Sequence, residues 1–305
     1  MPYLGLDIGG TKIAAAVLDE NGAVLLQQRT ATRKESYAQF LSDVCRIIAA
    51  LQGRFSVPLS IGIALPGGVS PLTGLIKNSN ILPLNGRPLQ QDLQRRLNQR
   101  VAIANDANCF TLSEALDGAG KGHRMVFGVT LGTGCGGGLV IDRQVIAGGH
   151  GNAAECGHNP LPGYDPARDG PAANCYCGQR NCVESFVSGT GLAERYLSLT
   201  GRKATAQDIV ALAELGDAAA ARQFDRYLDQ LARMLATIVN LIDPDVIVFG
   251  GGLSNVPALY RDISSRVAAY TFTDRFCTPI VRAVHGDDSG VRGAAWVGKE
   301  ISSGN

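Results

Sequence analysis

The chain has 305 residues, of which 45% are hydrophobic and 18% are charged. This balance excludes a disordered chain, and the length corresponds to about two domains. Twenty-eight basic and 27 acidic residues leave a net charge of +1, which argues against a broad surface for nucleic acid or anionic membranes. The sequence has no apolar stretch of about 20 residues and no basic, signal-like start. We therefore expect a cytoplasmic protein without nucleic-acid or membrane partners.

Hydrophobic periodicity predicts strands and helices that alternate along the first half of the chain. Strands are expected at 3–8, 12–18, 23–28, 59–65 and 101–104, and helices at 37–51, 89–97 and 106–115. A strand, glycine turn and strand at 126–142 repeat the arrangement at 3–18, which indicates a duplicated fold. In the C-terminal part of the chain, the pattern predicts helices at 188–199, 205–214, 218–242, 256–270 and 290–298, and strands at 246–249 and 280–283. This alternation favours an α/β fold.

Three glycine clusters each follow a predicted strand. Turns rich in glycine expose backbone N–H groups that bind phosphate oxygens, although each turn alone could be an ordinary hairpin. Asp7, placed just before the first cluster, is a candidate ligand for magnesium. The candidate phosphate-binding residues are Asp7, Gly9, Gly10, Thr11 and Lys12, then Gly132, Thr133 and Gly134, and finally Gly250, Gly251 and Gly252.

Asn105 and Asp106 stand at the end of a predicted strand and the start of a predicted helix. A carboxylate at a strand end can serve as a general base. Asp is also a common helix N-cap residue. The spacing alone leaves the two interpretations of Asp106 equally open.

Four residues that bind metals cluster within 25 positions: His158, Cys175, Cys177 and Cys182. One histidine and three cysteines match a closed tetrahedral zinc site, which is structural because it leaves no coordination position open. Glu155 and Glu184 flank this loop. They are either surface carboxylates or acceptors for the hydroxyl groups of a sugar.

Taken together, these motifs resemble the ROK family of sugar kinases and repressors over essentially the whole chain. The resemblance rests on Asp7-x-Gly-Gly-Thr-Lys12, Pro66-Gly67, Asn105-Asp106, Gly132-Thr133-Gly134, Glu155-x-x-His158, Cys175-x-Cys177-Gly178-x₃-Cys182-x-Glu184 and Gly250-Gly251-Gly252. One position departs from the family pattern, because Ala154 precedes Glu155 where the family usually has glycine. We expect this small residue to be tolerated.

The resemblance implies an actin-like, duplicated ribonuclease-H-type fold with two α/β domains around a central cleft. The expected small domain comprises residues 1–117 plus 288–305, and the expected large domain, with the zinc loop, comprises 118–287. ATP, Mg²⁺ and structural Zn²⁺ are the implied cofactors, and a homodimer is the implied assembly.

The resemblance also implies roles for individual residues. Asp106 is expected to take the proton from the sugar 6-hydroxyl, which then attacks the γ-phosphate of ATP. His158 is expected to bind zinc with one ring nitrogen and to face the sugar with the other. The expected sugar-binding residues are Asn80, Asn105, Asp106, Glu155, His158 and Glu184.

The sequence points to two kinds of sugar. Segments 70–74, 158–162 and 185–191 resemble manno(fructo)kinases, whereas 108–115 and the first helix resemble N-acetylglucosamine kinases. Because pocket segments should weigh more, we expect a free hexose such as fructose, mannose or glucose, with N-acetyl-D-glucosamine as the alternative.

Proteins of other classes are also possible. A repressor needs a DNA-binding segment before the first strand, for which residues 1–2 leave no room, and an actin-like ATPase does not need the zinc loop. A catalytically inactive sugar sensor is expected to lack the base, whereas Asp106 is present.

Overall fold

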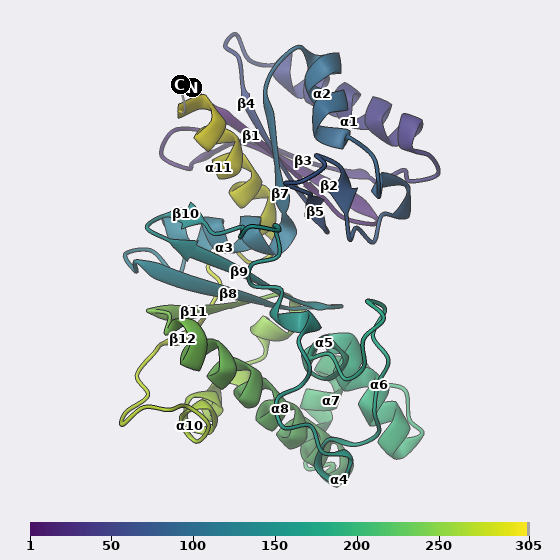
Figure 1. The fold of residues 1–305 in the computed structure, drawn as a ribbon, viewed down its shortest axis with the longest axis vertical. Coiled ribbons are helices and arrows are strands. Elements are labelled where there is room, and N and C mark those ends of the chain that lie inside the picture. The colour runs from purple at the N-terminus through teal and green to yellow at the C-terminus, as the bar shows by residue number, and fades with distance from the viewer. Residues whose placement is uncertain (304–305) are drawn as a thin grey trace. The chain divides into compact units, whose positions relative to one another are not determined.

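A computed structural model describes residues 1–303 of the chain (Figure 1). The chain divides into two compact units. Unit 1 comprises Met1–Lys121, Gly138–Ala153 and the segment from Asp287 on, and unit 2 comprises Gly122–Gly137 and Ala154–Gly286. Residues 138–153 therefore group with unit 1, whereas we expected them in the large domain. The functional domain division expected from the resemblance stays a prediction.

A five-stranded sheet forms the centre of unit 1, with the order β3-β2-β1-β4-β7. Its first three strands are antiparallel neighbours, whereas β1, β4 and β7 run parallel. The strands are β1 (Tyr3–Ile8), β2 (Lys12–Leu18), β3 (Val24–Ala31), β4 (Ser60–Leu65) and β7 (Val101–Asn105). The carboxyl ends of β1, β4 and β7 therefore lie at one edge, where the sequence places Asp7, Pro66 and Asn105.

The two faces of this sheet are packed differently. On β2, Ile13 and Val17 join the large core that α1 (Tyr37–Gln52) and α2 (Leu89–Leu97) cover. The alternate residues Ala14 and Ala16 pack instead against Val291 of α11 (Ser289–Ser303) on the opposite face (Figure 1). Small residues on that second face let α11 approach the strands closely. α3 (Asp106–Asp117) follows β7 and packs against α11.

A second five-stranded sheet has the order β10-β9-β8-β11-β12. Its strands are β8 (Met125–Leu131), β9 (Cys135–Ile141), β10 (Gln144–Val145), β11 (Val246–Gly250) and β12 (Ile280–Arg282). The pairs β8/β11 and β11/β12 are parallel, and β9/β10 is antiparallel. Each sheet thus places three consecutive strands in reverse spatial order beside two later parallel strands. This repetition confirms the predicted α/β fold and is the duplication that the sequence indicated.

Short elements complete unit 1. Strands β5 (Gly68–Val69) and β6 (Ile76–Lys77) form a small sheet of their own, and a 3₁₀ turn, η1 (Leu82–Leu84), follows. The hydrophobic pattern did not predict β5 or β6, because two-residue strands carry no periodicity.

Helices make up most of unit 2. They are η2 (Cys156–His158), α4 (Pro166–Asp169), α5 (Glu184–Val187), α6 (Gly189–Thr200), α7 (Ala206–Glu214), α8 (Ala218–Ile242), η3 (Gly252–Asn255), α9 (Ala258–Arg261) and α10 (Ile263–Ala268); a further 3₁₀ turn, η4 (Gly286–Asp288), leads into α11. The prediction of one continuous helix at 256–270 is wrong, because the segment forms two short helices, α9 and α10, that are separated at Asp262. The helix expected at 188–199 is confirmed as α6 but is preceded by the separate turn α5.

Within residues 1–303, no helix combines the length and apolar character that a membrane crossing requires.

Candidate functional site

The first glycine cluster forms the turn between β1 and β2 in unit 1. Gly9 N–H donates to the carbonyl of Lys12 (2.9 Å), and the Thr32 hydroxyl donates to the carbonyl of Gly9 (2.8 Å). These bonds fix the turn at its base. The side chains of Thr11 and Lys12 are exposed at its tip. The turn therefore presents a hydroxyl group and a cation to solvent, as a phosphate-binding loop requires.

The carboxylate of Asp7 lies beneath this turn. A methyl group at Gly290, in the first turn of α11, would come within 2.5 Å of Asp7 Oδ2, so the carboxylate packs directly against that helix start. Burial first, and the negative charge of Asp106 second, raise the pKa of Asp7 to about 6, although Lys12 opposes the shift. Two neighbouring carboxylates, one of them partly buried, form a site that a divalent cation would stabilise, and oxygen ligands are those that Mg²⁺ prefers.

Asn105, and not Asp106, is the N-cap of α3. Asn105 Oδ1 accepts hydrogen bonds from the backbone N–H groups of Ala107 (2.9 Å) and Asn108 (3.3 Å). The cap interpretation of Asp106 is therefore wrong, because its neighbour supplies the cap. Asp106 is the first helical residue, its side chain is exposed, and Oδ1 accepts from Ala107 N–H (2.9 Å). Partial loss of water raises the pKa of Asp106, and backbone N–H donors oppose this shift.

Asn80 and Asn105 are linked through Gly67. Asn105 Nδ2 donates to the carbonyl of Gly67 (3.1 Å), and Gly67 packs so tightly against residues 77–79 that a methyl group would lie 2.7 Å from Ser79 N. Asn80 follows Ser79 directly and is exposed. Unit 1 thus brings Asn80, Asn105 and Asp106 to one edge of its sheet.

The second and third glycine clusters come together in unit 2. Gly132, Thr133 and Gly134 form the turn between β8 and β9, which Gly132 N–H closes by donating to the carbonyl of Gly134 (3.0 Å). Gly251 follows β11 and has a φ of +79°; a side chain there would lie 2.9 Å from Gly132 N. Glycine is therefore required at position 251 both by the backbone and by the close approach of the two loops.

The carboxylate of Glu184 contacts this second turn. Glu184 Oε2 accepts from the backbone N–H of Cys135 (2.9 Å), and a methyl group at Gly134 would overlap the same carboxylate. Five residues further on, Gly189 N–H donates to the carbonyl of Gly132 (2.7 Å). The segment that follows the cysteine loop is therefore bonded to the glycine turn at two points. Residue types and spacing alone did not indicate this link.

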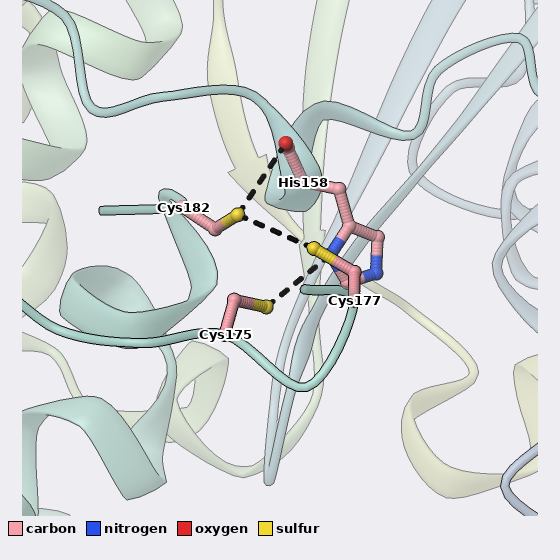
Figure 2. Close-up of side chains that lie close together, drawn as sticks. All are labelled: His158, Cys175, Cys177 and Cys182. Carbon is pink, nitrogen blue, oxygen red and sulfur yellow. Dashed lines mark hydrogen bonds between the residues drawn. The ribbon is translucent and has the colours of Figure 1, made fainter. Parts of the chain in front are cut away.

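His158, Cys175, Cys177 and Cys182 converge on one point, and their potential ligand atoms all lie within 4.8 Å of one another (Figure 2). Cys175 Sγ is 3.6 Å from His158 Nδ1, and Cys177 Sγ is 3.6 Å from Cys182 Sγ. A disulfide needs about 2.05 Å between its sulfur atoms. A tetrahedral zinc with Zn–S bonds of about 2.3 Å separates its sulfur ligands by about 3.8 Å. The donor set and its spacing therefore fit Zn²⁺, with Nδ1 as the histidine ligand.

Glu155 is held at the centre of a tight turn next to this cluster. Its φ of −69° and ψ of 53° are those of an inverse γ-turn, and Cys156 N–H donates across it to the carbonyl of Ala154 (2.6 Å). Ala154 has a φ of +66°, a conformation that favours glycine. Alanine in place of the family's glycine therefore strains the backbone at position 154. Our expectation that it is tolerated rested only on the small size of its side chain.

Tyr176 also belongs to this site, although the motifs in the sequence did not single it out. Its hydroxyl lies 3.0 Å from His158 Nε2, and the two rings meet edge to face, with centroids 5.2 Å apart. Loss of water around its hydroxyl first, and then the charges of Glu184, Cys175 and Glu155, raise the pKa of Tyr176 to about 12, although most of the residue remains exposed. The only hint in the sequence was its position between two predicted zinc ligands.

The chain is similar to known proteins over almost its whole length. The profile of the ROK family matches residues 3–301. The chain is 40% identical over 299 residues to the N-acetyl-D-glucosamine kinase of Shigella flexneri. The matched region covers 97% of this chain and 98% of the relative.

Among solved structures, the ROK hexokinase of Thermus thermophilus matches with a TM-score of 0.87 and 28% identity over the full length of both chains. A ROK glucokinase of Streptomyces griseus, solved with glucose and AMPPNP, matches with a TM-score of 0.76 and 28% identity. It covers 98% of this chain and 100% of the glucokinase.

Proposed function

We propose that this chain, which belongs to the ROK family and is a sugar kinase, transfers the γ-phosphate of ATP to the 6-hydroxyl of N-acetyl-D-glucosamine. The observation that carries the choice of sugar is the 40% identity to an N-acetyl-D-glucosamine kinase over 97% of the chain. The relatives thus favour the alternative that the sequence analysis placed second. A homodimer in the cytoplasm remains our expectation.

In the proposed reaction, the 6-oxygen of the sugar attacks the γ-phosphorus and the bond to the β-phosphate oxygen breaks, which releases ADP. Asp106 accepts the proton of the 6-hydroxyl. Its exposure at the start of α3, and the fact that Asn105 supplies the helix cap, leave the carboxylate available for this role. Such transfers depend mainly on positioning and charge neutralisation.

Unit 1 is proposed to hold phosphate groups and Mg²⁺. The turn of Gly9, Gly10, Thr11 and Lys12 offers backbone N–H groups, a hydroxyl and a cation, and Asp7 offers a carboxylate to the metal. The mutual repulsion of Asp7 and Asp106 supports a cation here. When bound, Mg²⁺ neutralises negative charge on the phosphates.

Unit 2 is proposed to contact both substrates. The turn of Gly132, Thr133 and Gly134 and the adjoining Gly250, Gly251 and Gly252 would receive ATP, and the AMPPNP complex of the Streptomyces griseus glucokinase supports ATP as the donor. Glu155, His158 and Glu184 would bind sugar hydroxyls, as would Asn80 and Asn105 from unit 1. Zinc, when bound to the four-residue cluster, would fix the loop that carries His158.

A free hexose is the second candidate substrate. Segments 70–74, 158–162 and 185–191 resemble manno(fructo)kinases, and the similarity to a ROK hexokinase and a ROK glucokinase favours the same reading. Hydrophobic contacts alone distinguish an added group only weakly, so activity with both sugars is compatible with this pocket chemistry.

The proposal is tested by ADP release with ATP and Mg²⁺ across N-acetylglucosamine, N-acetylmannosamine, glucose, mannose and fructose. We expect the highest kcat/KM with N-acetylglucosamine. The highest value with mannose or fructose would reject the choice of sugar but not the kinase activity. Absence of turnover with all five sugars, despite binding of one, would favour the inactive-sensor class.

Replacement of the proposed base provides the control for this assay. Asp106→Asn should lower kcat by about a hundred- to ten-thousandfold, the usual contribution of a general base. Sugar affinity, measured by calorimetry without ATP, should remain close to that of the wild type. Near-normal turnover by the variant would reject Asp106 as the base.

A further inference from the structure

Tyr176 occupies an unusual place in unit 2. It stands between the two zinc-ligand candidates Cys175 and Cys177, and its side chain is 79% exposed. Although the residue is exposed, its hydroxyl lies 3.0 Å from His158 Nε2. The edge-to-face contact of the two rings, at 88°, holds the phenol in that orientation.

His158 can donate one hydrogen bond toward Tyr176, from Nε2. Its Nδ1 points into the cysteine cluster, 3.6 Å from Cys175 Sγ. When Nδ1 binds a metal, the neutral imidazole carries its proton on Nε2, which can then donate one hydrogen bond. The phenolic oxygen of Tyr176 is placed to accept that bond. Any other acceptor must replace it.

Two carboxylates that are proposed to bind the sugar influence the phenol through their charge. The charges of Glu184 and Glu155 both act on the Tyr176 hydroxyl. The hydroxyl therefore contacts His158 and lies within the electrostatic influence of Glu155 and Glu184, the other two residues of unit 2 to which the proposed function assigns the sugar. Its chemistry, a neutral O–H in contact with an imidazole, is that of a sugar hydroxyl.

We propose that the Tyr176 hydroxyl competes with a hydroxyl of the substrate for His158 Nε2, so that this residue sets the affinity for the sugar. The inference rests on the proposed function, because it requires His158 to bind the sugar. Tyr176 is displaced readily because most of its side chain is already hydrated. The bond to His158 must nevertheless be broken before the sugar can accept from Nε2.

The test is the Tyr176→Phe variant, which keeps the ring and removes the competing oxygen. Loss of one competing hydrogen bond should lower the Kd for N-acetylglucosamine, measured by calorimetry without nucleotide, by about two- to tenfold. KM should fall in parallel, and zinc content should not change. Tyr270→Phe is the matched control, because it removes a partly exposed hydroxyl that donates to Asp229 (2.6 Å) elsewhere in unit 2.

A second measurement observes His158 directly. The chain has four histidines, so the Nε2 resonance of His158 can be assigned in ¹⁵N-histidine spectra. We expect this resonance to move both in Tyr176→Phe without sugar and in the wild type on addition of N-acetylglucosamine. If neither change moves it, the contact does not exist and the proposal is overturned.

The outcomes separate the two proposals. Wild-type protein that binds neither N-acetylglucosamine nor a hexose would reject the proposed function and, with it, the competition. Wild-type protein that binds sugar, together with a Tyr176→Phe variant of unchanged or weaker affinity, would reject the competition alone. Weaker affinity would show that Tyr176 assists the sugar and does not compete with it.

Discussion

Asp7 and Asp43 are two carboxylates of unit 1 whose surroundings shift their pKa values in opposite directions. Burial and the charge of Asp106 raise the pKa of Asp7 to about 6. A hydrogen bond from Arg46 lowers the pKa of Asp43. The ionised form of Asp7 is thus disfavoured by folding, and the ionised form of Asp43 is favoured. An acid whose pKa is raised by its surroundings and by a neighbouring carboxylate is more often retained for its chemistry than for stability.

This contrast predicts that Asp7→Asn stabilises the metal-free protein at pH 7. The folded pKa of about 6 lies above the value of about 3.9 expected in the unfolded chain, so the folded state binds the proton more tightly. The wild type therefore loses stability as the pH rises from about 4 to 6, and below about 4 the effect is absent. The variant lacks this loss, and its free energy of unfolding at pH 7 should exceed that of the wild type by about 1 to 3 kcal/mol.

Urea denaturation without Mg²⁺, at pH 4 and at pH 7, measures this difference. Asp43→Asn is the control of opposite sign and should destabilise the protein at pH 7, because its charged form is the one that Arg46 stabilises. Equal stability of Asp7→Asn and the wild type at both pH values would contradict the assigned shift. The same variant should lose kinase activity if Asp7 holds the metal.

At the scale of elements, the loop between η2 and α5 that carries Cys175, Cys177 and Cys182 contains little regular secondary structure. From residue 170 to 183 it has no helix and only two isolated bridges, Asn174↔Arg180 and Pro160↔Cys182. Such a loop gains little from hydrophobic burial, so metal binding is expected to contribute much of its order. The Glu184 carboxylate at its end then reaches the Gly134–Cys135 turn.

We therefore predict that Cys177→Ser lowers the zinc content from one per chain and raises the sugar KM by more than about tenfold. Cys177 and Cys277 are both exposed, but only Cys177 belongs to the cluster. Cys277→Ser is therefore the matched control and should keep its zinc and its KM. Elemental analysis and steady-state kinetics provide the two readouts. A wild type purified without chelator that contains no zinc would end this prediction.

Elements with strong periodicity could be predicted from the sequence. The helix expected at 218–242 is α8 to the residue, because its apolar positions repeat over seven turns and Asp217 caps its start. Breaks were harder to predict. The Ser188 hydroxyl accepts a hydrogen bond from Gly191 N–H (2.9 Å) and caps the start of α6. Residue type alone did not reveal that α5 and α6 are separate helices.

The site was predictable to the extent that its chemistry lies in residue type and spacing. The His158 and cysteine cluster is brought together as expected. The bond between Tyr176 and His158 and the left-handed backbone at Ala154 could not be predicted, because both depend on the three-dimensional path of the loop.

At the scale of the whole molecule, the first strand and the last helix of the chain pack together in unit 1. The last helix, α11, returns to cover the face of the first sheet that α1 and α2 leave open. Glycines make this return possible. Gly5 and Gly62 on the sheet face the backbone of α11, and Gly293 of α11 faces the backbone of Cys109. A helix can approach this closely only where neither surface carries a side chain.

This packing gives the last prediction, that Gly62→Ala strongly destabilises unit 1. A methyl group at Gly62 would overlap the carbonyl of Ala294 and lie 2.6 Å from Gly298 N, both of them backbone atoms of α11 that cannot rotate away. Overpacking of this kind costs about 1 to 3 kcal/mol or more. Gly68→Ala is the control, because nothing lies within 4 Å of its added methyl group. Urea denaturation should show a large loss for Gly62→Ala and little change for Gly68→Ala, whereas equal stabilities would mean that α11 does not pack on the sheet at this distance.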